Sequence, residues 1–212
     1  MKLEHWQNIL RTYRQVRTLL DQSLPPEPAS AQERIQVRVG AQGLALLQQQ
    51  LLFDVDALRA ALGAAYGEQE LEEALRPFVY LLDEKVRRRL ADEEQMEWPM
   101  LQFKLFGTDA GGDRFYELAD EKLQQRTASA LVFEMLHFCL TAGFEGRYEG
   151  NTARLREYKT RLAARIPKPE AMPAPPPVEA QAPLVHAFPW RYYAASSLLV
   201  VTLPVILWWL SR

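Results

Sequence analysis

The C-terminal end of the chain is the feature that most constrains how it folds. Nineteen consecutive residues, 192–210, carry no charge, and nine of them are large aliphatic residues. As a helix, this run would measure about 28 Å, which is close to the ~30 Å hydrocarbon core of a bilayer. The run therefore predicts a single membrane-spanning helix at 191–211. The alternative that stays open is a buried core helix at the end of a globular domain.

Aromatic residues stand at both borders of this run, as they do where a helix crosses the two headgroup regions of a bilayer. Pro204 lies inside the run, where lipid tolerates a proline better than a soluble helix does. The residues assigned to the span and its borders are Tyr192, Tyr193, Leu198, Leu199, Pro204, Trp208, Trp209 and Leu210. The chain is therefore expected to associate with a lipid bilayer.

The region before the span is expected to stay in the cytosol. The first residues carry recurring charges and no apolar run, so they do not predict a signal peptide. Cys139 is the single cysteine, which excludes an internal disulfide and agrees with a reducing compartment. The net charge of −2 lacks the basic excess of a nucleic-acid-binding protein. No polybasic cluster adjoins the apolar run.

Two further regions precede the span. Residues 167–189 hold eight of the fourteen prolines, which predicts an extended linker over 167–190. Residues 1–166 predict an all-α domain, because apolar residues recur at helical spacing, most clearly from Leu71 to Leu90. Pro77 predicts a kink or a break in that helix.

Several boundaries between helices are expected. A new short helix is predicted to start at Asp54 or Asp56, and another helix is predicted over 96–106, with Pro99 near its first turn. Glycines are expected to form the turns between helices, namely Gly107, Gly111, Gly112, Gly143 and Gly146.

The sequence contains few groups that indicate catalysis. It has no nucleophile elbow and no phosphate-binding loop, and its three histidines are too scattered to predict a metal site. Cys139 lies in an apolar stretch and is interpreted as a buried thiol. Asp83 and Glu84 are the one candidate acid–base pair. The alternative is a helix turn with one acid hydrogen-bonded and the other in solvent. No catalytic residue, metal or cofactor is predicted.

Four stretches, in this order, resemble the TssL family of type VI secretion systems, also called DotU or IcmH-like. The resemblance covers roughly residues 3–166 and, in addition, the C-terminal span. Within the family, the chain resembles the short form, which lacks a peptidoglycan-binding domain. The stretches are Pro77–Val86, Trp98 with the apolar residues up to Gly107, Gly111–Leu118, and Phe133–Leu140 leading into Gly143–Tyr148.

The resemblance implies a structural protein of the bacterial inner membrane rather than an enzyme. It implies a hook-shaped cytoplasmic domain made of two small packed helical bundles, and a C-terminus in the periplasm. The implied partners are TssM (IcmF-like) and the lipoprotein TssJ in the membrane complex, TssK and TssE in the baseplate, and a second copy of the chain. Two other functions stay open: a tail-anchored cytosolic adaptor, and a tail-anchored envelope enzyme that uses Asp83 and Glu84.

The resembling stretches also supply the candidate site, which is interpreted either as a folding motif or as the lining of a cleft used by a partner. Phe144 is expected to fill the core, and Tyr148 to pack its ring and use its hydroxyl. Arg147 is expected to pair with Glu145 or Asp83. The full set is Asp83, Glu84, Trp98, Gly112, Phe115, Tyr116, Phe144, Glu145, Gly146, Arg147 and Tyr148.

Overall fold

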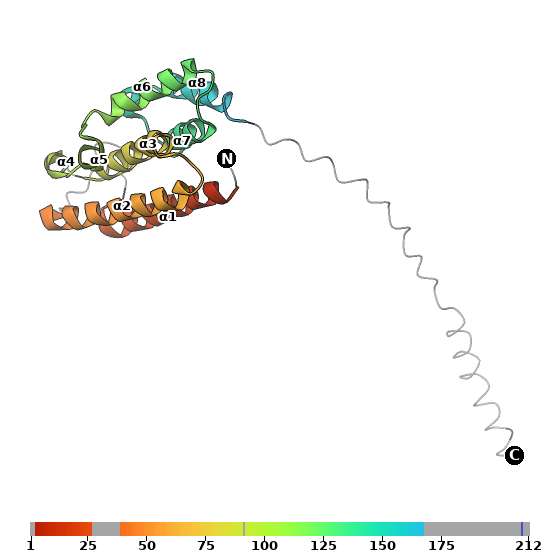
Figure 1. Ribbon diagram of the computed structural model, residues 1–212. Helices are drawn as coiled ribbons and strands as arrows, with labels where there is room; N and C mark the ends of the chain where they lie inside the picture. The colour runs from red at the N-terminus through yellow and green to blue at the C-terminus, as the bar shows by residue number, and fades with distance from the viewer. Residues whose placement is uncertain (1–2, 27–38, 91, 168–208, 210–212) are drawn as a thin grey trace. The chain divides into compact units, whose positions relative to one another are not determined.

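The computed structural model describes residues 3–26, 39–90, 92–167 and 209 (Figure 1). The chain divides into two units, Met1–Lys168 and Pro169–Arg212. The predicted linker and the predicted span lie outside the described residues, apart from Pro167 and Trp209. Among the residues that are described, no helix has both the length and the apolar character needed to cross a membrane.

The described part of the first unit is all-helical, as predicted, and contains no strand. Its elements are α1 (Leu3–Ser23), α2 (Gly40–Gly63), α3 (Glu68–Arg87), α4 (Asp92–Glu97), α5 (Leu101–Phe106), α6 (Gly111–Gln124), α7 (Ala130–Thr141), the 3-10 helix η2 (Gly146–Tyr148) and α8 (Thr152–Ala163).

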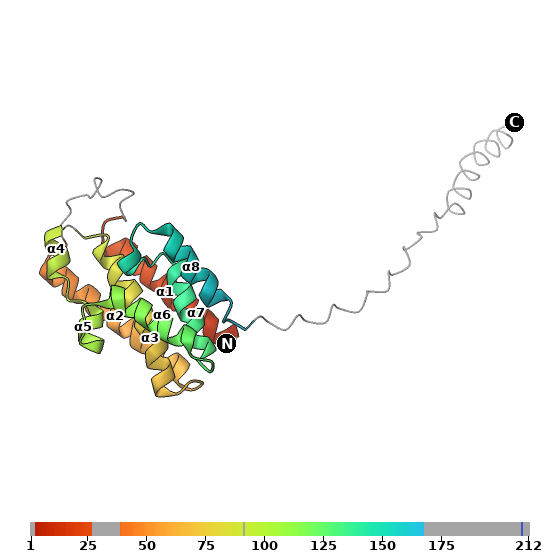
Figure 2. The same cartoon turned by 90° about the horizontal axis from the view of Figure 1, so that it is seen from above.

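The helices of this unit lie in three layers (Figures 1 and 2). Helices α1 and α2 form one outer layer, α6 and α8 form the other, and α3 and α7 pack against each other between them. The predicted stripe on α3 is buried throughout, from Leu71 to Val86 and on to Leu90 beyond the helix. Because α3 contacts α2 and α6, and α7 contacts α8, the middle layer joins the two outer layers, and the helices cluster as one unit.

Of the kink or break predicted at Pro77, the break is wrong, and the helix start predicted at Asp54 or Asp56 is also wrong. Helix α3 continues through Pro77, whose ring is itself buried in the core. Helix α2 continues through Asp54 and Asp56. In α2, Val55 lies between the two acids and Leu58 two residues after the second, and both are 1% exposed. Their burial on a shared face stabilises one continuous helix, by about 1.5–3 kcal/mol for each large apolar side chain.

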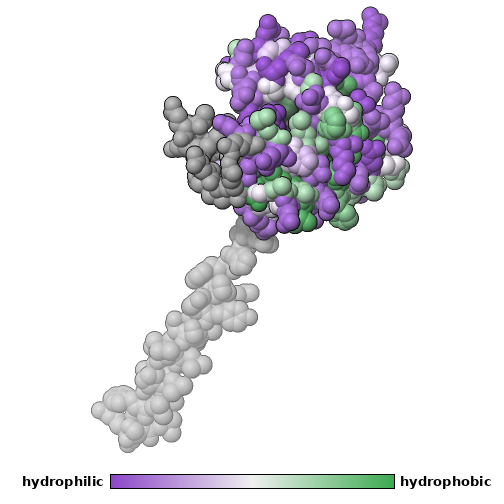
Figure 3. All heavy atoms as spheres, turned by 90° about the vertical axis from the view of Figure 1, so that its left-hand side faces the viewer, coloured by the Kyte–Doolittle hydropathy of each residue, from purple (hydrophilic) through white to green (hydrophobic). Residues whose placement is uncertain are grey.

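The predicted helix over 96–106 is also wrong, because α4 ends at Glu97 and α5 begins at Leu101. Pro99 disfavours helical backbone at Trp98, the residue before it. Figure 3 shows the end of the unit that carries α4 and α5, where apolar surface lies among hydrophilic residues. Met96 of α4 and Phe103 of α5 are 91% and 63% exposed.

The glycines divide into two groups. Gly107, Gly143 and Gly146 have positive φ and lie in connections, as predicted. Gly111 and Gly112 instead open α6.

Candidate functional site

Asp83 is a buried carboxylate of α3 that caps another helix. Its Oδ1 accepts hydrogen bonds from Trp98 Nε1 at 2.8 Å and from the Leu101 N–H at 2.9 Å, and its Oδ2 accepts one from the Gln102 N–H at 2.8 Å. The residue before α5, Met100, supplies no capping side chain. Asp83 therefore does for α5 what an N-cap residue does within its own helix. Burial raises the pKa of Asp83 to about 6, against the lowering effect of these hydrogen bonds.

Glu84 performs the same task for a more distant segment. Its two carboxylate oxygens accept the N–H groups of Glu145 at 3.0 Å and of Gly146 at 2.9 Å, where η2 begins. Arg88, one turn later on α3, lies 2.7 Å from the same carboxylate. Burial raises the pKa of Glu84, and the Arg88 charge opposes this rise. We call Asp83 and Glu84 together the acidic clamp.

The acidic clamp bears on both interpretations of the acid pair. The solvent alternative is wrong, because Asp83 is 2% exposed and the Glu84 side chain only 17%. Each carboxylate is also held by N–H donors of the protein, an arrangement that orders backbone and leaves few lone pairs for proton transfer. The acidic clamp fits a structural role.

A cluster of aromatic rings joins α6 to the segment that Glu84 holds. Phe144 is 2% exposed, as predicted, with its ring centroid 4.4 Å from that of Phe115. The Tyr116 ring lies 4.6 Å from the Tyr148 ring, and its hydroxyl donates to the Glu145 carbonyl at 2.7 Å. These contacts hold the segment that contains η2 against α6.

Two glycines let α6 and η2 approach closely. A Cβ on Gly146 would lie 2.9 Å from the Gly112 carbonyl oxygen, and a Cβ on Gly112 would lie 3.4 Å from the Arg147 nitrogen. Gly146 also has φ of +52°, which disfavours any residue with a side chain.

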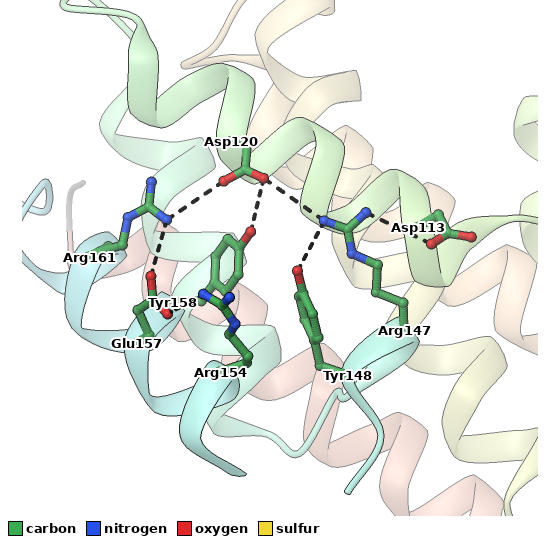
Figure 4. A network of polar contacts seen from close by, with 8 residues as sticks. All are labelled: Asp113, Asp120, Arg147, Tyr148, Arg154, Glu157, Tyr158 and Arg161. Carbon is green, nitrogen blue, oxygen red and sulfur yellow. Dashed lines mark hydrogen bonds and ion pairs between the residues drawn. The ribbon is translucent and has the colours of Figure 1, made fainter. Parts of the chain in front are cut away.

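Arg147 does not pair with Glu145 or Asp83, so that prediction is wrong. Its guanidinium lies 5.2 Å from the Tyr116 ring centroid and 5.1 Å from that of Tyr148. It also donates a hydrogen bond to the Tyr148 hydroxyl at 3.3 Å, so the prediction that this hydroxyl is hydrogen-bonded is confirmed. Its nitrogens lie 3.9 Å from Asp113 and 4.0 Å from Asp120 (Figure 4).

Asp120 of α6 joins Arg147 to α8 in the same network. It accepts a hydrogen bond from the Tyr158 hydroxyl at 2.9 Å and lies 3.8 Å from Arg161 (Figure 4). Burial, followed by the bond to Asp120, raises the pKa of Tyr158 to about 12. The eight residues drawn include three arginines and three carboxylates, so their charges balance.

A cleft of about 320 Å³ lies between these elements. Its charged lining has both signs and includes Arg87, Arg88 and Arg147 together with Asp109, Asp113 and Glu149. The predicted residues that line it are Asp83, Glu84, Gly112, Phe144, Gly146 and Arg147. Trp98, Phe115 and Tyr116 are buried, whereas Glu145, just before η2, and Tyr148, at its end, are half-buried.

Other cleft residues were missed. Arg87 and Arg88 lie four residues after Asp83 and Glu84, a spacing that places them on the same side of a helix and could have revealed them. Gln102 gave no such signal, because its position depends on the Asp83 cap. Its Oε1 is buried and has no hydrogen-bond partner among the described residues.

The described residues contain no group of three or more His, Cys, Asp or Glu side chains suited to a metal ion. Cys139 is buried, as predicted, and burial raises the pKa of its thiol.

Similar folds occur in three solved proteins. DotU from Francisella novicida matches with a TM-score of 0.59 and 18% identity, over 78% of this chain and 100% of that chain. The cytoplasmic domain of TssL from Acinetobacter baumannii matches with a TM-score of 0.56 and 16% identity, over 77% of this chain and 99% of that chain. SciP/TssL from enteroaggregative Escherichia coli 042 matches with a TM-score of 0.54 and 24% identity, over 84% of this chain and 97% of that chain. At these identities the likeness shows the fold alone.

The comparison with curated proteins gives no match. The family model described as type VI secretion system protein DotU matches residues 10–211, which is nearly the whole chain. The chain therefore belongs to the DotU family of type VI secretion system proteins.

Proposed function

We propose that this chain is a structural inner-membrane component of a type VI secretion system, which anchors the contractile baseplate to the envelope-spanning complex. The observation that carries the proposal is the extent of the family match, since residues 10–211 include both the helical unit and the predicted span. In this proposal the helical unit lies in the cytoplasm, as the name of the Acinetobacter baumannii structure says of that domain. The C-terminus lies in the periplasm.

The cleft is the proposed contact surface for a protein partner. Its walls are ordered by the acidic clamp and by the close approach of Gly112 and Gly146, so a partner meets a surface that needs little rearrangement. Its lining of arginines and carboxylates suits selective recognition, because charges of both signs must be matched. We assign TssK and TssE to the cytoplasmic contacts, and TssM and TssJ to the membrane complex.

A mild-detergent pull-down of the full-length chain from its native bacterium tests the anchoring role. Mass spectrometry is expected to identify a large IcmF-like membrane protein together with baseplate proteins. A variant with 191–212 deleted serves as the control, since it is expected to lose the membrane partners. Recovery of the chain alone, or with unrelated envelope enzymes, would contradict the proposal.

Charge reversal inside the cleft tests the contact surface. Arg87 and Glu149 are exposed and line the cleft, so Arg87→Glu and Glu149→Lys are expected to fold normally and to lose recovery of baseplate proteins. Arg11→Glu on α1, which is exposed and does not line the cleft, is the matched control. Unchanged recovery in both cleft variants would place the partner elsewhere.

A further inference from the structure

Basic residues are concentrated in the last helix of the helical unit and the residues just after it. Residues 152–168 contain one acid, Glu157, and six basic residues, Arg154, Arg156, Lys159, Arg161, Arg165 and Lys168. The whole chain has a net charge of −2, so the rest of it carries −7. Such asymmetry marks a surface for an anionic partner more often than it marks a requirement of the fold.

Half of these basic residues already have partners inside the unit. Arg154 lies 2.8 Å from Glu157, and Arg161 lies 3.8 Å from both Glu157 and Asp120. Arg165 donates to the carbonyl oxygens of Leu123 and Gln125, at the end of α6. Arg161 and Arg165 thus attach α8 and the residues after it to α6, whereas the Arg154 pair lies within α8.

Two further basic residues of α8 and one from the loop before α7 add to this charge. Arg156 on α8 and Arg126, which follows the Gln125 contact of Arg165, are exposed, and Lys159 is half-buried. None of the three forms an ion pair with any described residue. Lys159 also adds to the effect of burial in lowering the pKa of His137 on α7, which shows that its charge reaches that neighbour.

The basic face is held in a fixed direction. Tyr158 and Leu162 are 5% and 0% exposed and pack α8 against the unit, and the Tyr158 hydroxyl is bonded to Asp120. On the opposite side of the helix, Arg156 and Thr160 are exposed, one turn apart. The layer of α1 and α2 lies on the far side of the unit from α6 and α8 (Figure 1).

The position of α8 in the sequence identifies the anionic partner. It is the last described helix before residues 167–190, a stretch that would measure about 75 Å as an extended polyproline helix. If the predicted span is inserted, that reach keeps α8 near one membrane, and a tethered contact needs little affinity of its own. The cytoplasmic leaflet carries anionic lipids, which attract basic side chains.

We propose that the basic outer face of α8 binds the anionic phospholipid headgroups of the membrane that anchors the chain. The contact turns the layer of α1 and α2 away from the bilayer and toward the cytoplasm. This inference rests on the proposed function, because it requires the predicted span to be inserted.

Full-length chain in lipid nanodiscs tests the contact with a single fluorophore. Cys139 is buried, so a cysteine introduced by Thr160→Cys takes the label, and the unsubstituted chain measures background labelling. The nanodiscs contain phosphatidylcholine, with or without phosphatidylglycerol, and a headgroup-linked quencher. Quenching at Thr160→Cys is expected to rise when phosphatidylglycerol is present and to be lost at high salt.

Two matched variants separate charge from proximity. Arg156→Glu with Lys159→Glu is expected to abolish the phosphatidylglycerol-dependent quenching, whereas Arg11→Glu with Arg14→Glu on α1 is expected to preserve it. A label at Gln50→Cys, exposed on α2, is expected to show no dependence on lipid charge. Circular dichroism checks that all variants remain folded.

The outcomes distinguish the two proposals. A chain that enters the nanodiscs but shows the same quenching with and without phosphatidylglycerol overturns the α8 contact and leaves the anchor intact. Equal, charge-dependent quenching at residues 160 and 50 overturns the orientation. A chain that fails to enter nanodiscs overturns the membrane anchor, and the α8 contact with it.

Discussion

Asp83 and Glu84 are adjacent on α3, yet they hold the starts of two different elements. Asp83 accepts the N–H groups of Leu101 and Gln102 at α5, and Glu84 accepts those of Glu145 and Gly146 at η2. One turn of a central helix thus connects segments 18 and 62 residues further along the chain. The cleft exists in this form because both segments are held by that turn.

Replacing Asp83 with Asn is expected to lower the free energy of unfolding at neutral pH. The amide keeps one acceptor oxygen but turns an NH₂ group toward backbone N–H donors, so a buried donor is left unpaired. The expected loss is about 1–3 kcal/mol. Chemical denaturation of the full-length protein in detergent measures it, and secretion activity is expected to persist. An Asp83→Asn variant that is fully folded but inactive would favour the enzyme hypothesis.

The same residue predicts a dependence of stability on pH. Its pKa is about 6 in the folded chain, against an ordinary value of 3.8, so the folded state binds the proton more tightly. The contribution of the Asp83 proton to the free energy of unfolding is therefore full below about pH 4. It is lost as the pH rises through 6, and the loss amounts to roughly 3 kcal/mol. Denaturation curves at a series of pH values are expected to show a shallower fall for Asp83→Asn than for the unsubstituted chain. Parallel pH profiles would contradict the prediction.

Glu84→Gln is expected to loosen η2 and lower the free energy of unfolding by about 1–2 kcal/mol, since it weakens charge-assisted hydrogen bonds to two N–H groups. Glu72→Gln is the matched control on the same helix. Glu72 pairs with Arg76 at 2.6 Å, but both side chains are at least 40% exposed. Its substitution is expected to change stability by less than about 0.5 kcal/mol. Equal effects of the two changes in a thermal melt would argue against the clamp.

Helix periodicity revealed the core of this fold because it is a local property of the sequence. The stripe on α3 was predicted from spacing alone, and all of its members are buried. The boundaries were harder, because contacts that are distant in sequence set them. The start of α5 depends on a carboxylate eighteen residues earlier, and the continuity of α2 depends on the burial of Val55 and Leu58.

In the candidate site, too, local patterns were predicted better than contacts between residues distant in the sequence. Six residues of the candidate set line the cleft, but the predicted partners of Arg147, Glu145 and Asp83, were both wrong. Glu145 instead accepts the Gly150 N–H at 3.0 Å and lies 3.5 Å from Arg88. Asp120, which is near Arg147 in space, is 27 residues away in the sequence, and no local pattern connects the two.

Gly146→Ala is expected to be more damaging than Gly150→Ala, although both glycines have positive φ. A Cβ at Gly150 would meet nothing within 4 Å, so only backbone strain of about 1–2 kcal/mol is expected there. A Cβ at Gly146 would also push on the Gly112 carbonyl oxygen and on Phe144. Thermal melts of the two variants isolate the cost of that close approach. Equal melting temperatures would show that α6 can move away without penalty.

Arg147→Ala is expected to lower stability more than it lowers partner binding. The guanidinium lies within cation–π distance of the Tyr116 and Tyr148 rings, whereas its carboxylate neighbours are 3.9–4.0 Å away and the side chain is 33% exposed. The expected loss is about 1 kcal/mol, mostly from the contacts with the rings. Arg147→Lys is expected to restore little of it, because an ammonium is more strongly hydrated and cannot replace the broad guanidinium between the two rings. Melting temperatures and recovery of TssK from detergent extracts, measured on the same preparations, separate the two roles. An Arg147→Ala protein that melts like the unsubstituted chain but fails to recover TssK would make Arg147 a contact residue and refute its structural role.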